Sequence, residues 1–317
     1  MRIILIIYLL FFVVFLSAQD VHFSQVDISK INLNPALTGI QEDDFQLNTQ
    51  RRSQWGSVSD PFKTFSLSFY AKKYLLKKSI GLNFIHDIAG TSNFKTTGLN
   101  VSVAHNIIEN AKTLFSFGGL IGGFQRTLEY SSLIFIEEES IIDESIFFLD
   151  FALGTFYKRK VNDGFFIETG LSVYHLNNPN QSFLSNTDHN TPFKFNIHTF
   201  STHVITSKLQ LRYIVFLSKQ SSLQELIYGI DVNYQINNES KKNIQAIAGF
   251  YCRNKDAVIP KIGIGMNQFS FVMSYDVNVS ELSRASNNLG GLELSLIYKW
   301  SIAKKKSNNK FICPKYL

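Results

Sequence analysis

Cysteine is almost absent from this chain of 317 residues, whose two cysteines are Cys252 and Cys313. So low a cysteine content excludes a scaffold held together by disulfides and leaves at most one bond, between these two residues. Proline is also scarce, with six residues. After Leu16 the sequence has no further apolar run of the roughly 20 residues that a membrane helix needs. A bundle of membrane helices is therefore excluded as well.

The N-terminus predicts export. Met1-Arg2 supplies a positive charge, Ile3 to Leu16 is almost continuously apolar, and the small residues Ser17-Ala18 follow. Positive charge, a core of roughly 7–15 apolar residues and a small-residue cleavage site are the parts of a secretory signal peptide. A membrane anchor is the alternative, but the apolar run is too short to span a bilayer. We predict a signal peptide over residues 1–18 and no lipid anchor, because no cysteine lies near the junction.

The net charge of +6 raises the question of a nucleic-acid partner. The positive residues are dispersed in small clusters at predicted turns and in the C-terminal tail, where solvated charge is expected on any fold. Because the chain is predicted to be exported, we exclude nucleic acid as a partner.

Apolar and polar residues alternate with a period of two from Phe45 onward. In residues 65–69, for example, Phe, Leu and Phe alternate with serines, and residues 98–104 and 228–236 repeat the pattern. Strict alternation indicates strands, since a helix would space its apolar residues by three and four. The chain is 14% aromatic, with 29 Phe, and its mean hydropathy is +0.01. This composition is typical of strands with one apolar and one polar face.

Alternation of this kind fits either a soluble β-sandwich or an outer-membrane barrel. Repeated strands of about ten residues with aromatic ends favour the barrel, whose strands need roughly 9–11 residues to cross the hydrocarbon at a tilt. A closed barrel also pairs every backbone group, which lipid cannot do. We predict an all-β fold: a transmembrane antiparallel β-barrel of the bacterial outer membrane over residues 45–300.

Alternating runs between turn signals predict about 14 strands. Their predicted centres are Leu47, Leu67, Leu82, Val101, Phe117, Phe151, Leu171, Ile197, Leu211, Ile230, Ala246, Ile262, Met273 and Leu294. An even strand number is typical of single-chain bacterial barrels and puts both termini in the periplasm. We therefore expect a periplasmic N-terminal segment over residues 19–44 and a periplasmic basic tail over residues 301–317.

The predicted connections support this topology. Those after even-numbered strands should be short periplasmic turns, and those after odd-numbered strands should be longer external loops. The short connections are residues 108–112, 159–163, 205–207 and 237–242, and the long ones are residues 126–146, 176–191 and 279–290. Each has the length that its position requires.

No set of residues points to catalysis, a metal or a cofactor. The seven histidines are His22, His86, His105, His175, His189, His198 and His203. None has a metal-binding spacing such as HExxH, and the nearest pair, His198 and His203, would lie on opposite faces of a strand. No GxSxG, P-loop or GxGxxG stands between a strand and a helix. We predict no catalytic residue, no metal site, no cofactor and no enzyme activity.

Two clusters have both a functional and a structural interpretation. Gly118-Gly119 and Gly122-Gly123 look like a glycine-rich loop, but they interrupt an alternating strand, which favours close backbone packing or a bend in a barrel wall. Glu137-Glu138-Glu139, followed by Asp143 and Glu144, lies in the longest predicted external loop. A solvated loop is the simpler interpretation, and cation binding the sharper one.

Short motifs occur in order along nearly the whole chain. Phe23-Ser24-Gln25 lies near the start of the mature sequence, Asn34-Pro35 precedes Gly39, and Arg52 is followed by Gln54-Trp55. Asp87 lies in a segment bounded by glycines, and Tyr275-Asp276 lies near the end. With these motifs the sequence resembles the PorP/SprF family, the outer-membrane proteins of type IX secretion and gliding machinery in Bacteroidetes. The middle, roughly residues 131–222, carries little of the resemblance.

The resemblance implies a non-enzymatic outer-membrane component that docks periplasmic ring proteins and helps to export or anchor a surface adhesin. Its implied partners are outer-membrane lipid, the ring components of the secretion machinery and the C-terminal domain of a secreted adhesin. Two alternatives remain open: a porin-like channel for small solutes and an outer-membrane hydrolase. The substrate, the oligomeric state and whether the lumen is open are not defined by the sequence.

The motif residues have physical interpretations of their own. Asn34-Pro35 is a turn-forming pair, and Gly39 permits a positive φ, so a rigid N-terminal segment would plug or line the periplasmic mouth of the barrel. Arg52 would point inward or pair with an acid. Asp276 falls on the polar face of its strand, where an inward arginine is its natural partner, and Trp55 suits an interfacial position.

Overall fold

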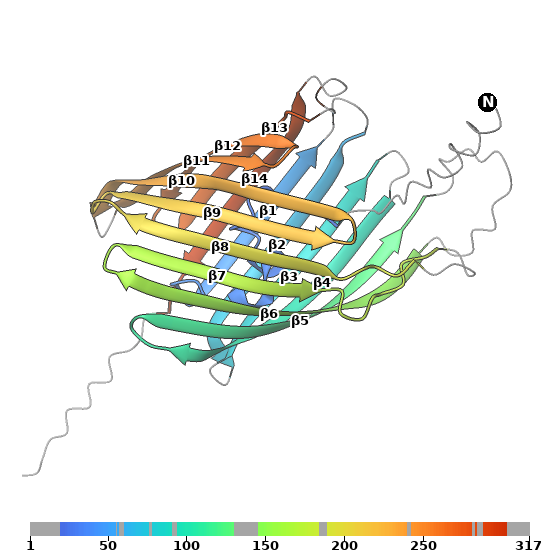
Figure 1. Ribbon diagram of the computed structural model, residues 1–317, viewed down its shortest axis with the longest axis horizontal. Helices are drawn as coiled ribbons and strands as arrows, with labels where there is room; N and C mark the ends of the chain where they lie inside the picture. The colour runs from blue at the N-terminus through green and yellow to red at the C-terminus, as the bar shows by residue number, and fades with distance from the viewer. Residues whose placement is uncertain are drawn as a thin grey trace, which may run out of the picture.

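The computed structural model describes residues 20–54, 56, 60–75, 78–90, 94–129, 145–183, 189–239, 242–280, 283 and 288–302 (Figure 1). Several sequence predictions lie outside these residues: the signal peptide over 1–18, Trp55, the acidic cluster over 137–144, Cys313 and the tail from 303. No helix among the described residues is long and apolar enough to cross a membrane.

Fourteen antiparallel strands close into a barrel, each paired with its neighbours in sequence and β1 paired with β14. The strands are β1 (Phe45–Gln54), β2 (Phe62–Leu75), β3 (Lys78–Ala89), β4 (Phe94–Glu109), β5 (Thr113–Thr127), β6 (Ser145–Asn162), β7 (Phe165–Tyr174), β8 (Lys194–Val204), β9 (Leu209–Gln220), β10 (Leu223–Glu239), β11 (Lys242–Arg253), β12 (Ala257–Met266), β13 (Phe269–Asn278) and β14 (Leu289–Trp300). The predicted all-β barrel and its strand number are confirmed, and every predicted centre lies within one strand.

The two ends of the barrel differ in their connections. The longest connections, over residues 128–144, 175–193 and 279–288, join odd-numbered strands to the next strand at one end, which we call the long-loop end. At the opposite, short-turn end, residues 163–164 and 205–208 are among the tight turns. The strands continue further into these turns than the sequence predicted, since β6 reaches Asn162 and β10 reaches Glu239.

The outer surface carries the apolar half of each alternating pattern. Leu99 of β4, Phe151 of β6 and Ile262 of β12, for example, are exposed on the outer face of the barrel. Aromatic rings gather outside β1, β2, β13 and β14 at the short-turn end, where Phe45 stacks on Trp300 with ring centroids 5.3 Å apart and Phe269 stacks on Tyr298 at 4.6 Å. Aromatic rings of this kind mark the interface between the hydrocarbon and the headgroups.

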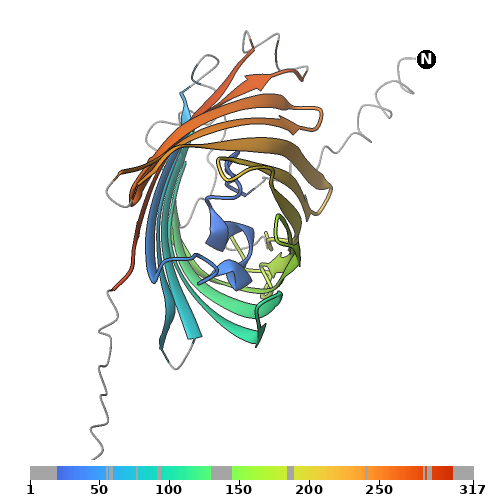
Figure 2. The same ribbon diagram turned by 90° about the vertical axis from the view of Figure 1, so that its left-hand side faces the viewer.

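Residues 20–44 lie inside the barrel rather than below it, as the view along the axis shows (Figure 2). We call residues 20–44 the luminal segment. It contains a one-turn helix, α2 (Lys30–Leu33), and a 3-10 turn, η1 (Pro35–Leu37), and most of its side chains are buried. The sequence predicted a periplasmic segment over residues 19–44 that would plug or line the mouth of the barrel. The chain turns inward instead because a 14-stranded barrel has a lumen wider than its own side chains fill.

The luminal segment fits the lumen because both are amphipathic. Its apolar residues Val26, Leu33 and Leu37 pack against apolar side chains from β6 and from β8 to β12. The opposite wall, formed by β14 and β1 to β4, is polar inside. Its buried members include Gln46, Asn48, Gln50, Ser66, Ser68, Asn83, Asn100, Ser102 and Ser295. Asn48 and Ser102 bond the segment directly, through Ile28 O at 3.0 Å and Thr38 Oγ1 at 2.7 Å.

Inward-facing glycines let the segment reach the backbone of the wall. Gly118 of β5 pairs with Gly154 of β6, and η1 lies on this pair. A Cβ built on Gly118 would lie 2.6 Å from the backbone of Ala36. The side-chain amide of Asn34 donates a hydrogen bond to a backbone carbonyl of the wall, Thr155 O, at 2.9 Å. Of the predicted glycines Gly118-Gly119 and Gly122-Gly123, only Gly118 packs closely against backbone of the luminal segment; a Cβ on Gly122 or Gly123 would meet side chains.

We expect Gly118→Ala to dislodge the luminal segment, because a methyl group would overlap the rigid backbone of Ala36. Overpacking of this kind costs about 1–3 kcal/mol, and denaturant titration in lipid vesicles would measure it. The matched control is Gly119→Ala, the next residue, whose Cβ would meet only Leu153 Cδ2 at 3.5 Å. Equal stability of the two variants would contradict the packing described here.

Candidate functional site

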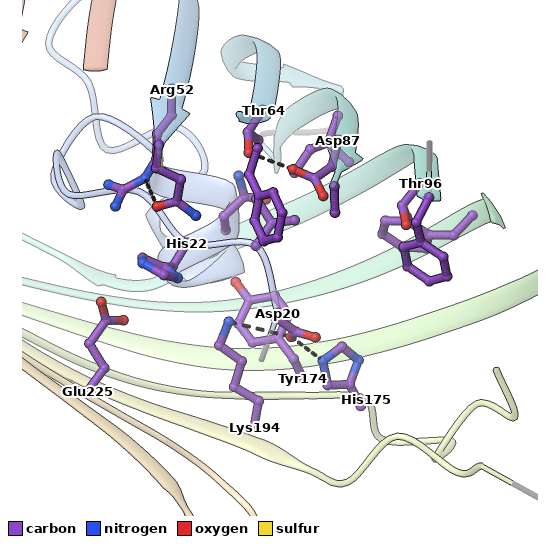
Figure 3. Close-up of a pocket in the computed structure, with 18 of the residues that line it drawn as sticks. Asp20, His22, Arg52, Thr64, Asp87, Thr96, Tyr174, His175, Lys194 and Glu225 are labelled. Carbon is purple, nitrogen blue, oxygen red and sulfur yellow. Dashed lines mark hydrogen bonds and ion pairs between the residues drawn. The ribbon is translucent and has the colours of Figure 1, made fainter. Parts of the chain in front are cut away.

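A cavity of about 690 Å³ occupies the lumen at the long-loop end, above the luminal segment (Figure 3). Asp20, Val21 and His22 form part of its floor, and the strand ends nearest the long loops form its walls. The charged residues among its lining are Asp20, Arg52, Asp87, Arg126, Asp150, His175, Lys194, Glu225, Arg253, Asp256 and Asp276. The cavity is therefore rich in both signs of charge.

Arg52 holds the luminal segment to β13 and β14. Its guanidinium lies 2.8 Å from Asp276 Oδ2 and 3.2 Å from Glu293 Oε2, and it donates a further bond to Ser24 Oγ. Arg52, Asp276 and Glu293 are at most 2% exposed. Gln54 accepts from Arg52 Nε at 3.0 Å and so fixes the plane of the guanidinium. Buried charges of this kind are stable only when paired and hydrogen-bonded.

The luminal segment completes these ion pairs with its backbone. The amides of Ser24 and Gln25 donate to the two carboxylate oxygens of Glu293 at 2.8 and 3.1 Å, and Ser24 Oγ lies 2.8 Å from Asp276 Oδ1. Gln25 Nε2 reaches Ser274 Oγ at 2.9 Å. Without the segment, Asp276 would keep Arg52 and Arg253, and Glu293 would keep Arg52 and Gln50, but both carboxylates would lose the donors that Ser24 and Gln25 supply.

Arg253 extends the charged cluster along the wall. It contacts Asp276 Oδ2 at 3.0 Å, Asp256 Oδ2 at 3.1 Å and Glu225 Oε1 at 3.0 Å. It also donates to Ser24 Oγ. Ser24 is thus the point at which both buried arginines and Asp276 meet.

His175 ties the start of the luminal segment to the wall. Its Nε2 lies 2.6 Å from Asp20 Oδ2 and its Nδ1 lies 3.1 Å from Asp150 Oδ1, while Lys194 Nζ lies 3.5 Å from Asp20 (Figure 3). Burial alone would lower the pKa of His175, but the two carboxylates outweigh burial and raise the pKa to about 9. The imidazole is therefore a cation at neutral pH, and the bridge between Asp20 and Asp150 is ionic.

The acid–base properties of Asp20 and His22 follow from the same surroundings. Burial would raise the pKa of the Asp20 carboxyl, but Lys194 and His175 outweigh it and hold the pKa below its usual range. Burial, together with the positive charges of Arg52 and Arg253, keeps the pKa of His22 well below its usual range. Asp20 is therefore an anion and His22 is neutral at physiological pH.

The structure brings five of the predicted site residues together in one cluster: Ser24, Gln25, Arg52, Gln54 and Asp276. Asp276 has the inward arginine partner that the sequence predicted, and this partner is Arg52. Phe23 is buried beside the cluster. Sequence reasoning did not select Glu293, Arg253 or His175 as site residues. The available signal was a charged residue at an inward position of an alternating strand, as in Leu292-Glu293-Leu294.

The remaining predicted residues lie elsewhere. Asn34 and Pro35 sit on the glycines of β5 and β6, and Gly39 has a φ of +82° with no room for a Cβ beside Ser79. Asp87 lines the far wall of the cavity. Tyr275 is on the outer face of β13, opposite to its neighbour Asp276. Within the described part of the chain, no group of His, Cys, Asp and Glu is arranged to hold a metal ion.

The fold and site define a class: an outer-membrane β-barrel whose lumen holds a folded N-terminal segment. Residues 15–298 match the family described as the type IX secretion system membrane protein PorP/SprF. The chain belongs to this family and is a membrane component of type IX secretion. No curated protein is significantly similar to the chain in sequence.

Solved barrels share the fold at low sequence identity. The toluene transporter TbuX of Ralstonia pickettii is 9% identical with a TM-score of 0.51, and the match covers 86% of this chain and 94% of TbuX. A deletion mutant of the monoaromatic hydrocarbon channel TodX is 9% identical with a TM-score of 0.53, with the same coverage of 86% and 94%. At such identity the likeness establishes the architecture alone.

We expect Arg52→Met to lower the free energy of unfolding by about 3–5 kcal/mol, because Glu293 would remain buried without its cation and Asp276 would keep only Arg253. Denaturant titration in vesicles measures the loss. Arg51→Met is the matched control, since Arg51 lies on the outer, exposed face of the same strand, where the change should stay within about 1 kcal/mol. Similar losses for both variants would show that the ion pairs do not hold the segment.

His175 should stabilise the barrel in a pH-dependent way. Its folded pKa of about 9 lies above the unfolded value of 6.5, so its contribution is complete below pH 6.5 and disappears as the pH rises through 9. We expect wild type to exceed His175→Asn by at most about 3 kcal/mol at pH 6 and to match it near pH 10. Asn is chosen because His175 has a positive φ of 62°, which Asn tolerates. A difference that is constant from pH 6 to 10 would refute the ionic bridge.

Proposed function

We propose that this protein is a non-enzymatic docking platform of the type IX secretion and gliding machinery. In this proposal its short-turn end binds periplasmic ring proteins, and its long-loop end helps to export or anchor a surface adhesin through the adhesin's C-terminal domain. The observation that carries the proposal is the luminal segment, which is packed across the lumen and held by buried ion pairs. A barrel occupied in this way is suited to binding at its two ends rather than to free passage.

The orientation follows from the connections. In single-chain bacterial barrels the short turns face the periplasm and the longer loops face the exterior. The strand ends that the connections over residues 128–144 and 175–193 join then face outward, and the start of β1 and the end of β14 face the ring components. A non-enzymatic role is supported by the family, which is described as a membrane protein of the type IX secretion system.

A photo-crosslinking amino acid at each end tests the docking role. Ser207 is exposed in a turn at the short-turn end and Asn177 is exposed in a loop at the long-loop end. We expect the Ser207 variant to crosslink ring components and the Asn177 variant to crosslink a secreted adhesin, both in the native host. Reversed partners would overturn the orientation. Failure of both variants, and of a detergent pull-down of the tagged protein, to recover any secretion component would overturn the proposal.

A porin-like channel for small solutes is the second candidate, and the cavity at the long-loop end favours it. Conductance in planar bilayers separates the two functions. We expect wild type to be silent and a variant lacking residues 20–43 to conduct, because only the variant has an empty lumen. Steady conductance of wild type would favour the channel.

A further inference from the structure

Two charged side chains of the cavity have no ion-pair partner among the described residues, and these are Asp87 and Arg126. The other charged lining residues are each engaged in an ion pair. Asp87 accepts one hydrogen bond, from Thr64 Oγ1 at 2.6 Å. Arg126 donates to Thr96 Oγ1 at 3.1 Å and to Gln181 Oε1. A carboxylate and a guanidinium therefore face the same cavity with charge that the protein itself leaves unmatched.

The register of the sheet places these two groups in one row. Asp87 of β3 is opposite Thr96 of β4, and Thr96 is opposite Arg126 of β5, with all three on the inner face. Neighbouring strands are about 4.8 Å apart, so the Cα atoms of Asp87 and Arg126 are roughly 10 Å apart. Asp87 and Thr96 can be seen on the same wall in Figure 3. Arg126 leans toward Thr96, which brings its positive charge nearer to Asp87.

The surface around the two charges is apolar and aromatic. The guanidinium of Arg126 lies 5.1 Å from the ring centroid of Phe94 and 5.6 Å from that of Phe148. Ile85, Leu120 and Phe124 also line the cavity. These rings pack against the guanidinium, and Nη2 is the nitrogen for which the described residues supply no hydrogen-bond acceptor. The wall thus combines a fixed cation, a fixed anion and an apolar surface.

We propose that this wall binds a small zwitterion with an apolar side chain, of the class of short peptides and amino acids. The carboxylate would bind Arg126, the ammonium would bind Asp87, and the apolar side chain would pack against Phe94 and Phe148. A simple anion would leave Asp87 without a partner, and a hydrocarbon would leave both charges desolvated, which is costly. The volume of about 690 Å³ is within the range of small-molecule sites. This proposal does not depend on the docking role.

Isothermal titration of the full-length protein in detergent tests the site with three forms of one peptide. The probes are the dipeptide leucyl-phenylalanine, its N-acetyl form, which lacks the ammonium, and its C-terminal amide, which lacks the carboxylate. We expect the zwitterion to bind at least about tenfold more tightly than either blocked form, since each lost charged hydrogen bond has an effect of that size. Equal binding of the three forms, or no binding at millimolar concentration, would overturn the proposal.

Two variants assign the charges. Asp87→Asn should abolish the preference over the N-acetyl form and keep the preference over the amide, and Arg126→Gln should do the reverse. Lys158→Gln is the matched control, because Lys158 is an inward cation of β6 near the short-turn end, paired with Glu168, outside the cavity lining. It should leave all three affinities unchanged. If only the carboxylate matters, in the probes and in the variants, the site is an anion site and the zwitterion assignment is wrong. The blocked peptides on wild type decide the matter even if a variant fails to fold.

Discussion

The buried contact between Ser24 and the Arg52–Asp276–Glu293 cluster is the interaction on which the rest of the structure depends. A barrel of 14 strands encloses more space than its own side chains fill, so something must occupy the lumen and satisfy the charges that face it. The luminal segment does both, because its amides reach the carboxylate of Glu293 and its hydroxyl reaches Asp276 and both arginines. The contact also holds the chain next to Asp20, Val21 and His22, which form part of the floor of the cavity.

The segment is held in place by matching chemistry on two sides. Polar groups at Ser24 and Gln25 meet the polar wall of β13, β14 and β1, whereas Val26 and Leu33 meet the apolar wall of β8 to β12. A segment that was apolar all round would deprive Asp276 and Glu293 of the hydrogen-bond donors of Ser24 and Gln25, and one that was polar all round would leave the apolar wall uncovered. Gly118 and Gly154 then allow a backbone-to-backbone approach that a side chain would prevent.

A single row of paired residues along the cavity wall differs in its charge pairing between its two ends. One row of the sheet runs from Glu293 through Arg52, Thr64, Asp87 and Thr96 to Arg126. At its β14 end the charges are matched by each other and by the luminal segment, which makes that part structural. At its β5 end the charges face open space beside aromatic rings, which is the arrangement of a binding surface. One continuous ladder of paired residues therefore contains both the ion pairs that hold the luminal segment and the two charges that we propose bind a ligand.

The sequence by itself determined the architecture, because the period of two and the parity of the turns are local properties of strands that must face lipid on one side. It also placed Asp276 on the luminal face and indicated Gly39 as a residue with positive φ. Only the tertiary structure decided how far residues 20–44 enter the barrel and which charges remain unpaired. Ser24 and Glu293 are 269 positions apart, and Arg52 and Asp276 are 224 apart. Contacts at that separation depend on closure of the barrel and on the register of its last strands, and no local pattern encodes either.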